Sequence, residues 1–178
     1  EDRVDLRMGT FSKSLASCGG FIAGSSEVIE FLRYSSRSFM FTASAVPAAV
    51  GAALAAVKIC RSPEGPELFA RVLSNAAYLR SGLASLGYDV VDTGARDADG
   101  EPLHSPVVPV LVGDDWKAAL LWKALFDGGV YTNVALYPAV ERGGALLRTS
   151  VMATHEPEHL DRALRVFEEC RPMLDADG

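Results

Sequence analysis

The sequence predicts an α/β fold, in which short apolar strands alternate with helices along the chain. Two observations carry this prediction. Short apolar segments bounded by Gly, Pro or Asp suit strands, and the segment 107–112 is the clearest of them. Longer segments place apolar residues at helical spacing, as in 67–86. The alternation is most regular from Tyr88 onward, which predicts a compact α/β domain with a mixed sheet and helices on one side of it.

The first part of the chain begins with two short predicted strands. Apolar residues alternate with polar ones over 4–8, and 21–24 is an apolar segment that suits a strand buried on both faces. A helix is expected over 25–37, because its apolar residues follow helical spacing and the Ser25-Ser26 pair can cap its first turn. The segment 39–44 is expected to be a short hydrophobic strand or turn.

Two helices are predicted next. The Ala/Val-rich segment 47–59 begins with a proline and is expected to be a buried helix. The segment 63–66 contains two prolines and a glycine, which break the chain. A longer helix is predicted over 67–86, with an apolar stripe on one face and charged residues turned to solvent.

The remaining elements belong to the expected compact domain. Strands are predicted at 89–91, 107–112, 130–136 and 146–151, with a Gly- and Asp-rich loop over 93–102. A helix over 116–127 follows the capping residues 113–115, and a closing helix begins at 156–158. The residues expected to face inward on the first of these helices are Ala119, Leu120, Ala124 and Leu125.

Composition excludes several classes of function. The length of 178 residues suits one domain, and a formal net charge of −6 provides no basic surface for nucleic acid. No apolar segment is long enough to cross a bilayer, and no signal peptide opens the chain. The 3 cysteines are not spaced as a disulfide framework or a metal site. We therefore expect reduced thiols, a cytoplasmic location and no bound metal.

Lys13 is the strongest candidate for chemistry. It lies in the predicted loop between the first two strands, among the hydroxyls of Thr10, Ser12, Ser14 and Ser17. A lysine amine whose pKa is lowered can form a Schiff base with a carbonyl. If that carbonyl belongs to pyridoxal phosphate (PLP), the hydroxyls and loop N–H groups can hold the phosphate. The alternative from composition alone is a structural lysine that points to solvent from a Ser-rich turn.

Four blocks of sequence, 9–24, 39–44, 105–110 and 146–155, resemble the α-oxoamine synthases in the order that this family has them. The first block, Gly-Thr-Phe-Ser-Lys-Ser-Leu-Ala-Ser-Cys-Gly-Gly-Phe-Ile-Ala-Gly, resembles the segment that carries the family's cofactor lysine. The family consists of fold-type I PLP-dependent transferases and includes serine palmitoyltransferase, 5-aminolevulinate synthase, 8-amino-7-oxononanoate synthase and 2-amino-3-ketobutyrate ligase. The amino-acid sequences of the last two blocks are most similar to those of serine-palmitoyltransferase-like bacterial members.

The resemblance implies a domain organisation. It assigns 1–62 to the end of the large PLP-binding domain, 63–87 to a linking helix and 88–178 to the small C-terminal α/β domain. In the family, an Asp and a His that contact the cofactor ring precede the lysine by a long stretch, and neither has a counterpart here. We therefore expect this chain to be the C-terminal part of a longer enzyme, and to bind PLP weakly and catalyse nothing alone.

The resemblance also implies roles for single residues. Lys13 forms the Schiff base with PLP, while Thr10 and Ser12 contact its phosphate. Thr42 and Ser44 reach across a homodimer interface to the phosphate of the partner's cofactor; the alternative is that these hydroxyls satisfy only local backbone groups.

Arg148 is implied to hold the α-carboxylate of the amino-acid substrate. It interrupts an otherwise apolar strand, where a free charge is costly to bury. Without the resemblance, a structural ion pair with Asp or Glu is favoured for this residue. His155 also matches the family pattern and is expected to cap or orient the closing helix.

The implied reaction is a decarboxylative condensation of an amino acid with an acyl thioester, which yields an α-amino ketone, in a homodimer with shared active sites. Two alternatives remain: a non-catalytic partner subunit of the same fold, and a PLP aminotransferase. Some relatives have an arginine before a Pro-Pro pair in the loop at 136–140, and here that arginine is missing. The amino acid, the acyl chain and the carrier, coenzyme A or a carrier protein, stay open.

Overall fold

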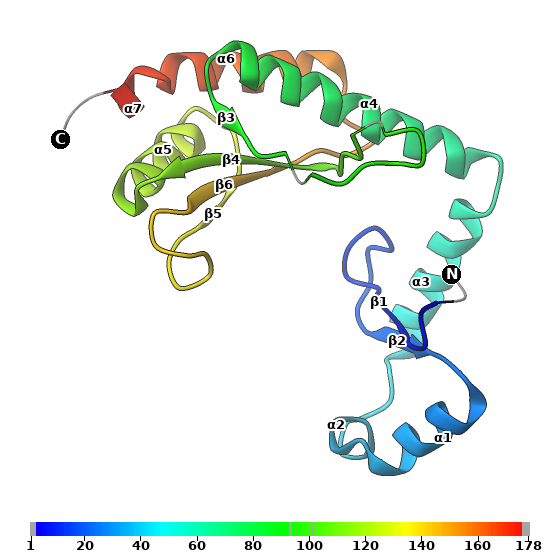
Figure 1. Cartoon of the computed structure of the whole chain (residues 1–178). Coiled ribbons are helices and arrows are strands. Elements are labelled where there is room, and N and C mark those ends of the chain that lie inside the picture. The colour runs from blue at the N-terminus through cyan, green and yellow to red at the C-terminus, as the bar shows by residue number, and fades with distance from the viewer. Residues whose placement is uncertain (1–2, 93, 101, 176–178) are drawn as a thin grey trace. The chain divides into compact units, whose positions relative to one another are not determined.

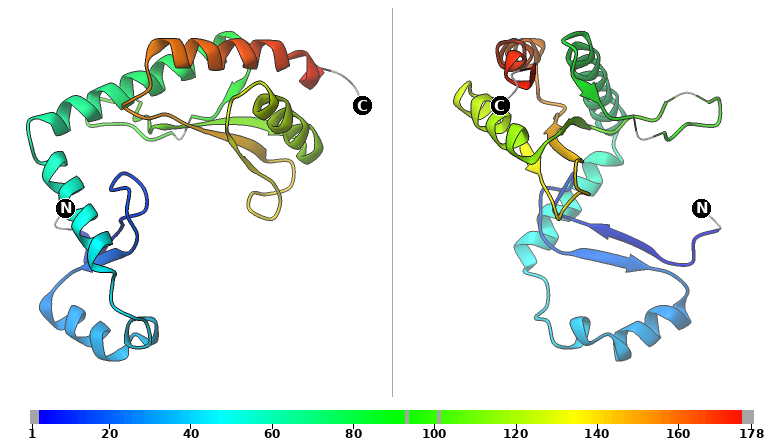
Figure 2. Two further views of the ribbon diagram at one scale, coloured as in Figure 1. Left: turned by 180° about the vertical axis from the view of Figure 1, so that it is seen from behind. Right: turned by 60° about the vertical axis from the view of Figure 1, so that its left-hand side comes forward.

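The computed structural model describes residues 3–92, 94–100 and 102–175. The chain forms two compact units, Glu1–Pro66 and Glu67–Gly178, each of which has its own arrangement of elements (Figures 1 and 2). The finer three-part division that the resemblance implies stays a prediction.

The first unit opens with an antiparallel hairpin. Strand β1 (Arg7–Thr10) pairs with β2 (Gly20–Ala23), and Thr10 lies opposite Gly20. The predicted strand over 4–8 is thus displaced toward the C-terminus, because pairing extends only from Arg7, which lies opposite Ala23. The two strands hold the ends of the polar loop 11–19 together.

Three helices complete the first unit. Helix α1 (Ser26–Ser35) begins where predicted, and its cap Ser25 accepts a hydrogen bond from the Val28 N–H. Helix α3 (Pro47–Cys60) also agrees with the prediction. Between them lies the short helix α2 (Arg37–Met40), so the expectation of a strand or turn over 39–44 is wrong for its first two residues. The N–H groups of both bond back to the Ser36 carbonyl, which favours a helical turn.

The first unit has little interior of its own. Among its described residues, only Ala53 of α3 is a buried hydrophobic residue. The expectations of a buried 47–59 helix and of a strand buried on both faces at 21–24 are therefore wrong for this chain: Leu54 is 54% exposed and Ile22 is also 54% exposed. Both segments have the composition of buried elements, and no described part of this unit packs over them.

The second unit is a sheet with helices. Its strands are β3 (Asp89–Val90), β4 (Val107–Gly113), β5 (Asn133–Ala135) and β6 (Ala145–Ser150). Its helices are α4 (Glu64–Ser85), which begins at the end of the first unit, α5 (Asp115–Asp127), α6 (Pro157–Cys170) and α7 (Pro172–Asp175). The strand order is β3-β4-β6-β5, and every neighbouring pair is antiparallel. The expected mixed sheet is wrong, because β6 inserts between β4 and β5.

One face of this sheet carries the hydrophobic core. Val108 and Val110 of β4 and Leu147 of β6 are fully buried on that face. They pack into one cluster with residues from the three long helices, which lie together on this side (Figure 1). These residues are Ala76, Leu79 and Leu83 from α4, Leu121 and Leu125 from α5, and Leu160, Phe167 and Cys170 from α6. The expectation of helices on one side is confirmed.

The buried stripe of α5 differs from the predicted one. Ala118, Leu121 and Leu125 are buried, whereas Leu120, expected inside, is 42% exposed. Apolar residues occur around most of this helix, so their spacing does not select a single face. The helix start agrees with the prediction, because the Asp114 carboxylate accepts from the Lys117 N–H at 2.8 Å.

Candidate functional site

Lys13 lies in a loop that its own backbone closes. The Phe11 N–H donates to the Gly19 carbonyl at 2.9 Å, and the Ser17 N–H donates to the Phe11 carbonyl at 2.8 Å. A turn then runs from Lys13, whose carbonyl accepts from the Ala16 N–H at 3.0 Å. Ala16 takes a left-handed φ of 47°, an uncommon conformation for a residue with a side chain. The loop thus presents Lys13 at the start of a tight turn.

Glycines permit the close backbone approach at the base of this loop. A Cβ on Gly20 would lie 2.6 Å from the carbonyl oxygen of Gly9 across the hairpin. A Cβ on Gly9 would meet the Phe21 ring at 2.5 Å. The Phe21 ring also stacks near Phe11, with centroids 6.0 Å apart. Larger residues at either glycine would separate the strands that position the loop.

The surroundings of Lys13 are hydroxyls. Its Nζ donates to Ser12 Oγ at 3.1 Å, and the side chain is exposed. No carboxylate within the described ranges forms an ion pair with it. The amine and the hydroxyls of Thr10, Ser12 and Ser14 are therefore accessible, and this donor set fits an aldehyde that carries a phosphate.

Ser17 anchors the loop, a role that the sequence did not indicate. Its Oγ donates to the carbonyl of Ala49 in α3 at 2.6 Å. The two residues are far apart in the chain and Ser17 belongs to a serine-rich run, so no local pattern distinguishes this hydroxyl from its neighbours. The bond connects the loop that bears Lys13 to the longest helix of the first unit.

Thr42 and Ser44 follow α2 and are both exposed. The Thr42 hydroxyl donates to the carbonyl of Ser38 one helical turn back. In this chain the hydroxyl therefore has the local backbone partner that the alternative interpretation assigns to it. A contact with a phosphate across a dimer stays a prediction for both residues.

Arg148 lies in the second unit, on the face of the sheet opposite to the described helices α4, α5 and α6 (Figure 1). Along β6 the side chains alternate, so Leu147 and Thr149 are buried while Arg148 is exposed. It is flanked in the sheet by Pro109 of β4 and Asn133 of β5. Strand alternation turns its charge to the open face, so the guanidinium is not buried in the apolar strand. Nor does the structure give it an Asp or Glu partner among the described residues.

Two histidines near the start of α6 have different roles. Glu156 and His159 form a capping box, in which the Glu156 N–H donates to His159 Nδ1 at 3.0 Å. His155 instead accepts a hydrogen bond from the Met152 N–H at 3.3 Å. Burial is the main cause that lowers the pKa of its imidazole, and the nearby His159 lowers it further. The expectation that His155 caps the helix is wrong, because His159 does so, and the alternative that His155 orients the helix stays a prediction. Asn75 of α4 holds the turn between β6 and α6 by donating to the Met152 and His155 carbonyls.

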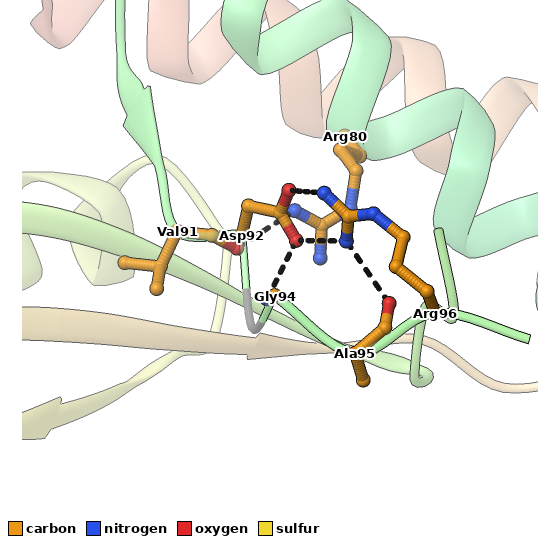
Figure 3. A network of polar contacts seen from close by, with 6 residues as sticks. All are labelled: Arg80, Val91, Asp92, Gly94, Ala95 and Arg96. Atoms are coloured by element: carbon orange, nitrogen blue, oxygen red, sulfur yellow. Dashed lines mark hydrogen bonds and ion pairs between the residues drawn. The ribbon is translucent and has the colours of Figure 1, made fainter. Parts of the chain in front are cut away.

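A polar network fixes the segment that follows β3 (Figure 3). Asp92 accepts two charge-assisted bonds from Arg96 and one from the Gly94 N–H, while Arg80 donates to the Val91 carbonyl at 2.9 Å. The hydrogen bonds from Arg96, which have the larger effect, and from the Gly94 N–H lower the pKa of Asp92 to about 2. Residues 93 and 101 of the predicted loop lie outside the described residues. The network involves no candidate site residue.

Within the described ranges, no helix combines the length and apolarity needed to cross a bilayer. In the same part of the chain, no cluster of three or more His, Cys, Asp or Glu side chains has a geometry that could hold a metal ion.

Comparison with known proteins gives a consistent result. A family model described as aminotransferase class I and II matches residues 1–167. Serine palmitoyltransferase of Bacteriovorax stolpii is 40% identical over 172 residues, which are 97% of this chain and 38% of that protein. An 8-amino-7-oxononanoate synthase of Thermoanaerobacter pseudethanolicus is 36% identical over 173 residues, covering 97% of this chain and 41% of that protein.

A solved structure agrees with these matches. Serine palmitoyltransferase K265A from S. paucimobilis, with a bound PLP–myriocin aldimine, superposes with a TM-score of 0.84 at 33% identity. The superposition covers 97% of this chain and 41% of that one. The chain thus spans well under half the length of the relatives it matches.

These matches confirm the resemblance seen in the sequence blocks around Lys13 and Arg148, and the α/β class of the fold. The relatives are those that the resemblance names, and the matched residues include nearly the whole chain. The chain belongs to the aminotransferase class I and II family.

Proposed function

We propose that the complete protein is a PLP-dependent acyltransferase of the α-oxoamine synthase type. It condenses an amino acid with an acyl thioester, releases carbon dioxide and yields an α-amino ketone. Support comes from the relatives, which are named serine palmitoyltransferase and 8-amino-7-oxononanoate synthase, and from a related structure with bound PLP. The observation that carries the proposal is the placement of Lys13 on a closed loop, exposed among hydroxyls and without a carboxylate partner in the described residues.

The residues of the first unit are assigned to the cofactor. Lys13 holds PLP through its amine, and the hydroxyls of Thr10 and Ser12 donate to the phosphate. In a homodimer, Thr42 and Ser44 of one protomer contact the phosphate site of the other, and the Thr42 hydroxyl exchanges its bond to the Ser38 carbonyl for one to the phosphate. PLP, when bound, supplies the electron sink that stabilises negative charge at the amino-acid Cα.

The remaining steps use side chains of this chain. Arg148 holds the α-carboxylate with its forked guanidinium and so fixes the orientation of the amino acid. As a free amine, Lys13 would take or return the proton at Cα as a general base or acid. The exposed position of Arg148 suits this role, because its five N–H donors are available to a ligand.

A dimer and a cytoplasmic location form part of the proposal. A two-stranded hairpin is marginally stable alone, and the first unit exposes large apolar side chains such as Phe31, Phe39 and Phe41. We assign their cover to the rest of the large domain and to a second copy of the protein. Free thiols at Cys18, Cys60 and Cys170 suit a reducing compartment.

Borohydride reduction of the PLP-loaded complete protein, followed by peptide mapping, tests the proposal. We expect the label on Lys13, and loss of the visible absorbance of the cofactor in Lys13→Ala. A label on another lysine, or on none, contradicts the assignment. Product analysis then separates the alternatives: exchange of the amino group with a keto acid indicates an aminotransferase, and failure to bind PLP indicates a non-catalytic subunit.

A further inference from the structure

The loop between β5 and β6 carries a second exposed arginine, Arg142. Residues 136–144 leave β5 next to the start of β6, where Ala135 lies opposite Leu146. In both views of Figures 1 and 2 the loop projects from the sheet on the side away from α4 and α6. The loop that carries Arg142 thus projects on the side away from these helices.

The guanidinium of Arg142 is held in place by an aromatic ring. Its central carbon lies 4.2 Å from the centroid of the Tyr137 ring. The loop is also stabilised by its own backbone, because the Ala139 N–H donates to the Leu136 carbonyl at 2.8 Å and the Gly144 N–H donates to the Glu141 carbonyl at 3.0 Å. A cation over a ring face at this distance is attracted by the ring quadrupole. The long side chain is thus ordered without an ionic partner.

Stacking leaves the donors of this arginine available. A guanidinium that lies on a ring uses its face, while its N–H groups point outward in the plane. No carboxylate in the described part of the chain pairs with Arg142, which is exposed. An ordered guanidinium with free donors is a receptor for an anion, and phosphate oxygens match its fork.

The positions of Arg142 and Arg148 suit the binding of two different anionic groups. Arg148 lies three residues inside β6 from Ala145, about 10 Å along the strand, and Arg142 lies on the loop before that strand. The Tyr137 ring holds the Arg142 guanidinium against its own loop. The anion at Arg142 is therefore a group other than the α-carboxylate that is assigned to Arg148.

We infer that Arg142, positioned by Tyr137, binds the phosphate of the phosphopantetheine arm that carries the acyl thioester. This inference rests on the proposed function, which supplies the thioester as a substrate. Coenzyme A and acyl-carrier proteins share this phosphate, so the contact serves either donor. Arg142 is then a substrate-binding residue, and Tyr137 is the residue that positions it.

Steady-state kinetics with paired donors tests the inference in the complete holoenzyme. Acyl-4′-phosphopantetheine and acyl-pantetheine differ only in the phosphate. In Arg142→Gln we expect the KM for the phosphorylated donor to rise about tenfold, the loss typical of one charge-assisted bond. The KM values for acyl-pantetheine and for the amino acid should not change. Arg165→Gln, which removes an exposed arginine from α6, serves as the matched control and should match the wild type.

Variants of Tyr137 test its positioning role. Tyr137→Phe keeps the ring and should behave as the wild type, whereas Tyr137→Leu should show the same phosphate-specific rise in KM as Arg142→Gln. A purely structural role would change both donors equally. The inference is overturned if Arg142→Gln raises the KM for the amino acid instead, if both donors respond alike, or if only acyl-coenzyme A responds, which would place the contact on its nucleotide phosphates.

Calorimetry separates failure of this inference from failure of the proposed function. Binding of 4′-phosphopantetheine and of pantetheine to the complete protein requires no turnover. We expect the phosphorylated compound to bind more tightly to the wild type, and Arg142→Gln to abolish that preference. If no amino ketone forms with any thioester but the preference persists, the condensation is wrong and the phosphate site stands. If the wild type shows no preference, the phosphate site is wrong whatever the reaction.

Discussion

The hydroxyl of Tyr88 donates a hydrogen bond to the carbonyl oxygen of Phe167 at 2.7 Å, and the two rings meet edge to face with centroids 5.2 Å apart. Tyr88 follows α4 and Phe167 lies in α6, so the pair joins the segment after α4 to α6. Both residues are buried, and the carbonyl would otherwise lack one of its acceptor contacts. The pair therefore stabilises the scaffold that presents β6.

We predict that Tyr88→Phe lowers the free energy of unfolding by about 1–2 kcal/mol, because the ring contact stays while a buried hydrogen bond is lost. Urea denaturation measures the change. Tyr78→Phe is the matched control: its hydroxyl donates to Asp161 on the exposed surface, and we expect a loss below about 0.5 kcal/mol. Equal effects of the two substitutions would contradict the assignment of a buried bond.

The same residue predicts a dependence on alkaline pH. Burial, and then the nearby Cys170, raise the pKa of Tyr88 above its ordinary value of 10.0. The phenol of Tyr88 therefore makes its full contribution to the free energy of unfolding below pH 10.0. This contribution is lost as the pH rises above that value, because the phenol ionises in the unfolded state first. Between about pH 8 and about pH 11, the free energy of unfolding should fall more in the wild type than in Tyr88→Phe. Parallel curves would contradict the raised pKa.

Local signals explain which parts of the fold could be predicted. Asp114 and Ser25 mark helix starts because their side chains cap N–H groups only three residues away. The sheet order could not be predicted, because the insertion of β6 between β4 and β5 depends on pairing over a long stretch of chain. Burial in the first unit was overestimated for a related reason: Ile22 and Leu54 have the composition of core residues whatever covers them.

For the candidate site too, residues with a local sequence signal could be predicted, whereas features that depend on the fold could not. Lys13 and Arg148 were predicted as site residues because each lies in a block of sequence typical of a family, and their types carry recognisable chemistry. The open side of the sheet on which Arg148 lies was not found, because one residue in an apolar strand does not show which face is covered. The stacking of Arg142 on Tyr137 was also missed, because a surface arginine in a loop resembles any solvated charge until the ring beneath it is seen.

Gly82 allows α4 to approach α6. A Cβ at this position would lie 2.5 Å from a methyl group of Leu164. We predict that Gly82→Ala destabilises the protein by about 1–3 kcal/mol through overpacking, although alanine is the better helix former. Urea denaturation measures the change. In a Leu164→Ala background the same substitution should be neutral or stabilising, and a loss that persists there would contradict the steric explanation.

The Asp92 carboxylate should titrate at about pH 2, because Arg96 and the Gly94 N–H stabilise its charged form. In Arg96→Gln we predict that its pKa moves toward the ordinary value of 3.8, which carboxyl-carbon NMR can follow. The network's contribution to stability is then present above pH 3.8 and is lost as the pH falls toward about 2. Arg71→Gln, which removes the separate pair with Glu156, should leave the titration of Asp92 unchanged.

Arg148 and Thr149 are neighbours that face opposite sides of β6, and they should separate function from stability. Arg148 is exposed on the open face, whereas the Thr149 hydroxyl donates to the Val108 carbonyl inside the core at 2.7 Å. We predict that Arg148→Gln lowers kcat/KM for the amino acid on the order of 100-fold, because a forked charge-assisted contact with the carboxylate is lost. Its free energy of unfolding should stay within about 0.5 kcal/mol of the wild type.

Thr149→Val should do the opposite. Valine leaves the Val108 carbonyl without its buried donor, so we expect a loss of about 1–3 kcal/mol in urea denaturation and a kcat/KM close to that of the wild type. Because the two side chains are adjacent in sequence, a disturbance of the strand would affect both measurements in both variants. A marked loss of stability in Arg148→Gln would therefore indicate that this arginine has a structural partner and would remove the main support for its role in binding the carboxylate.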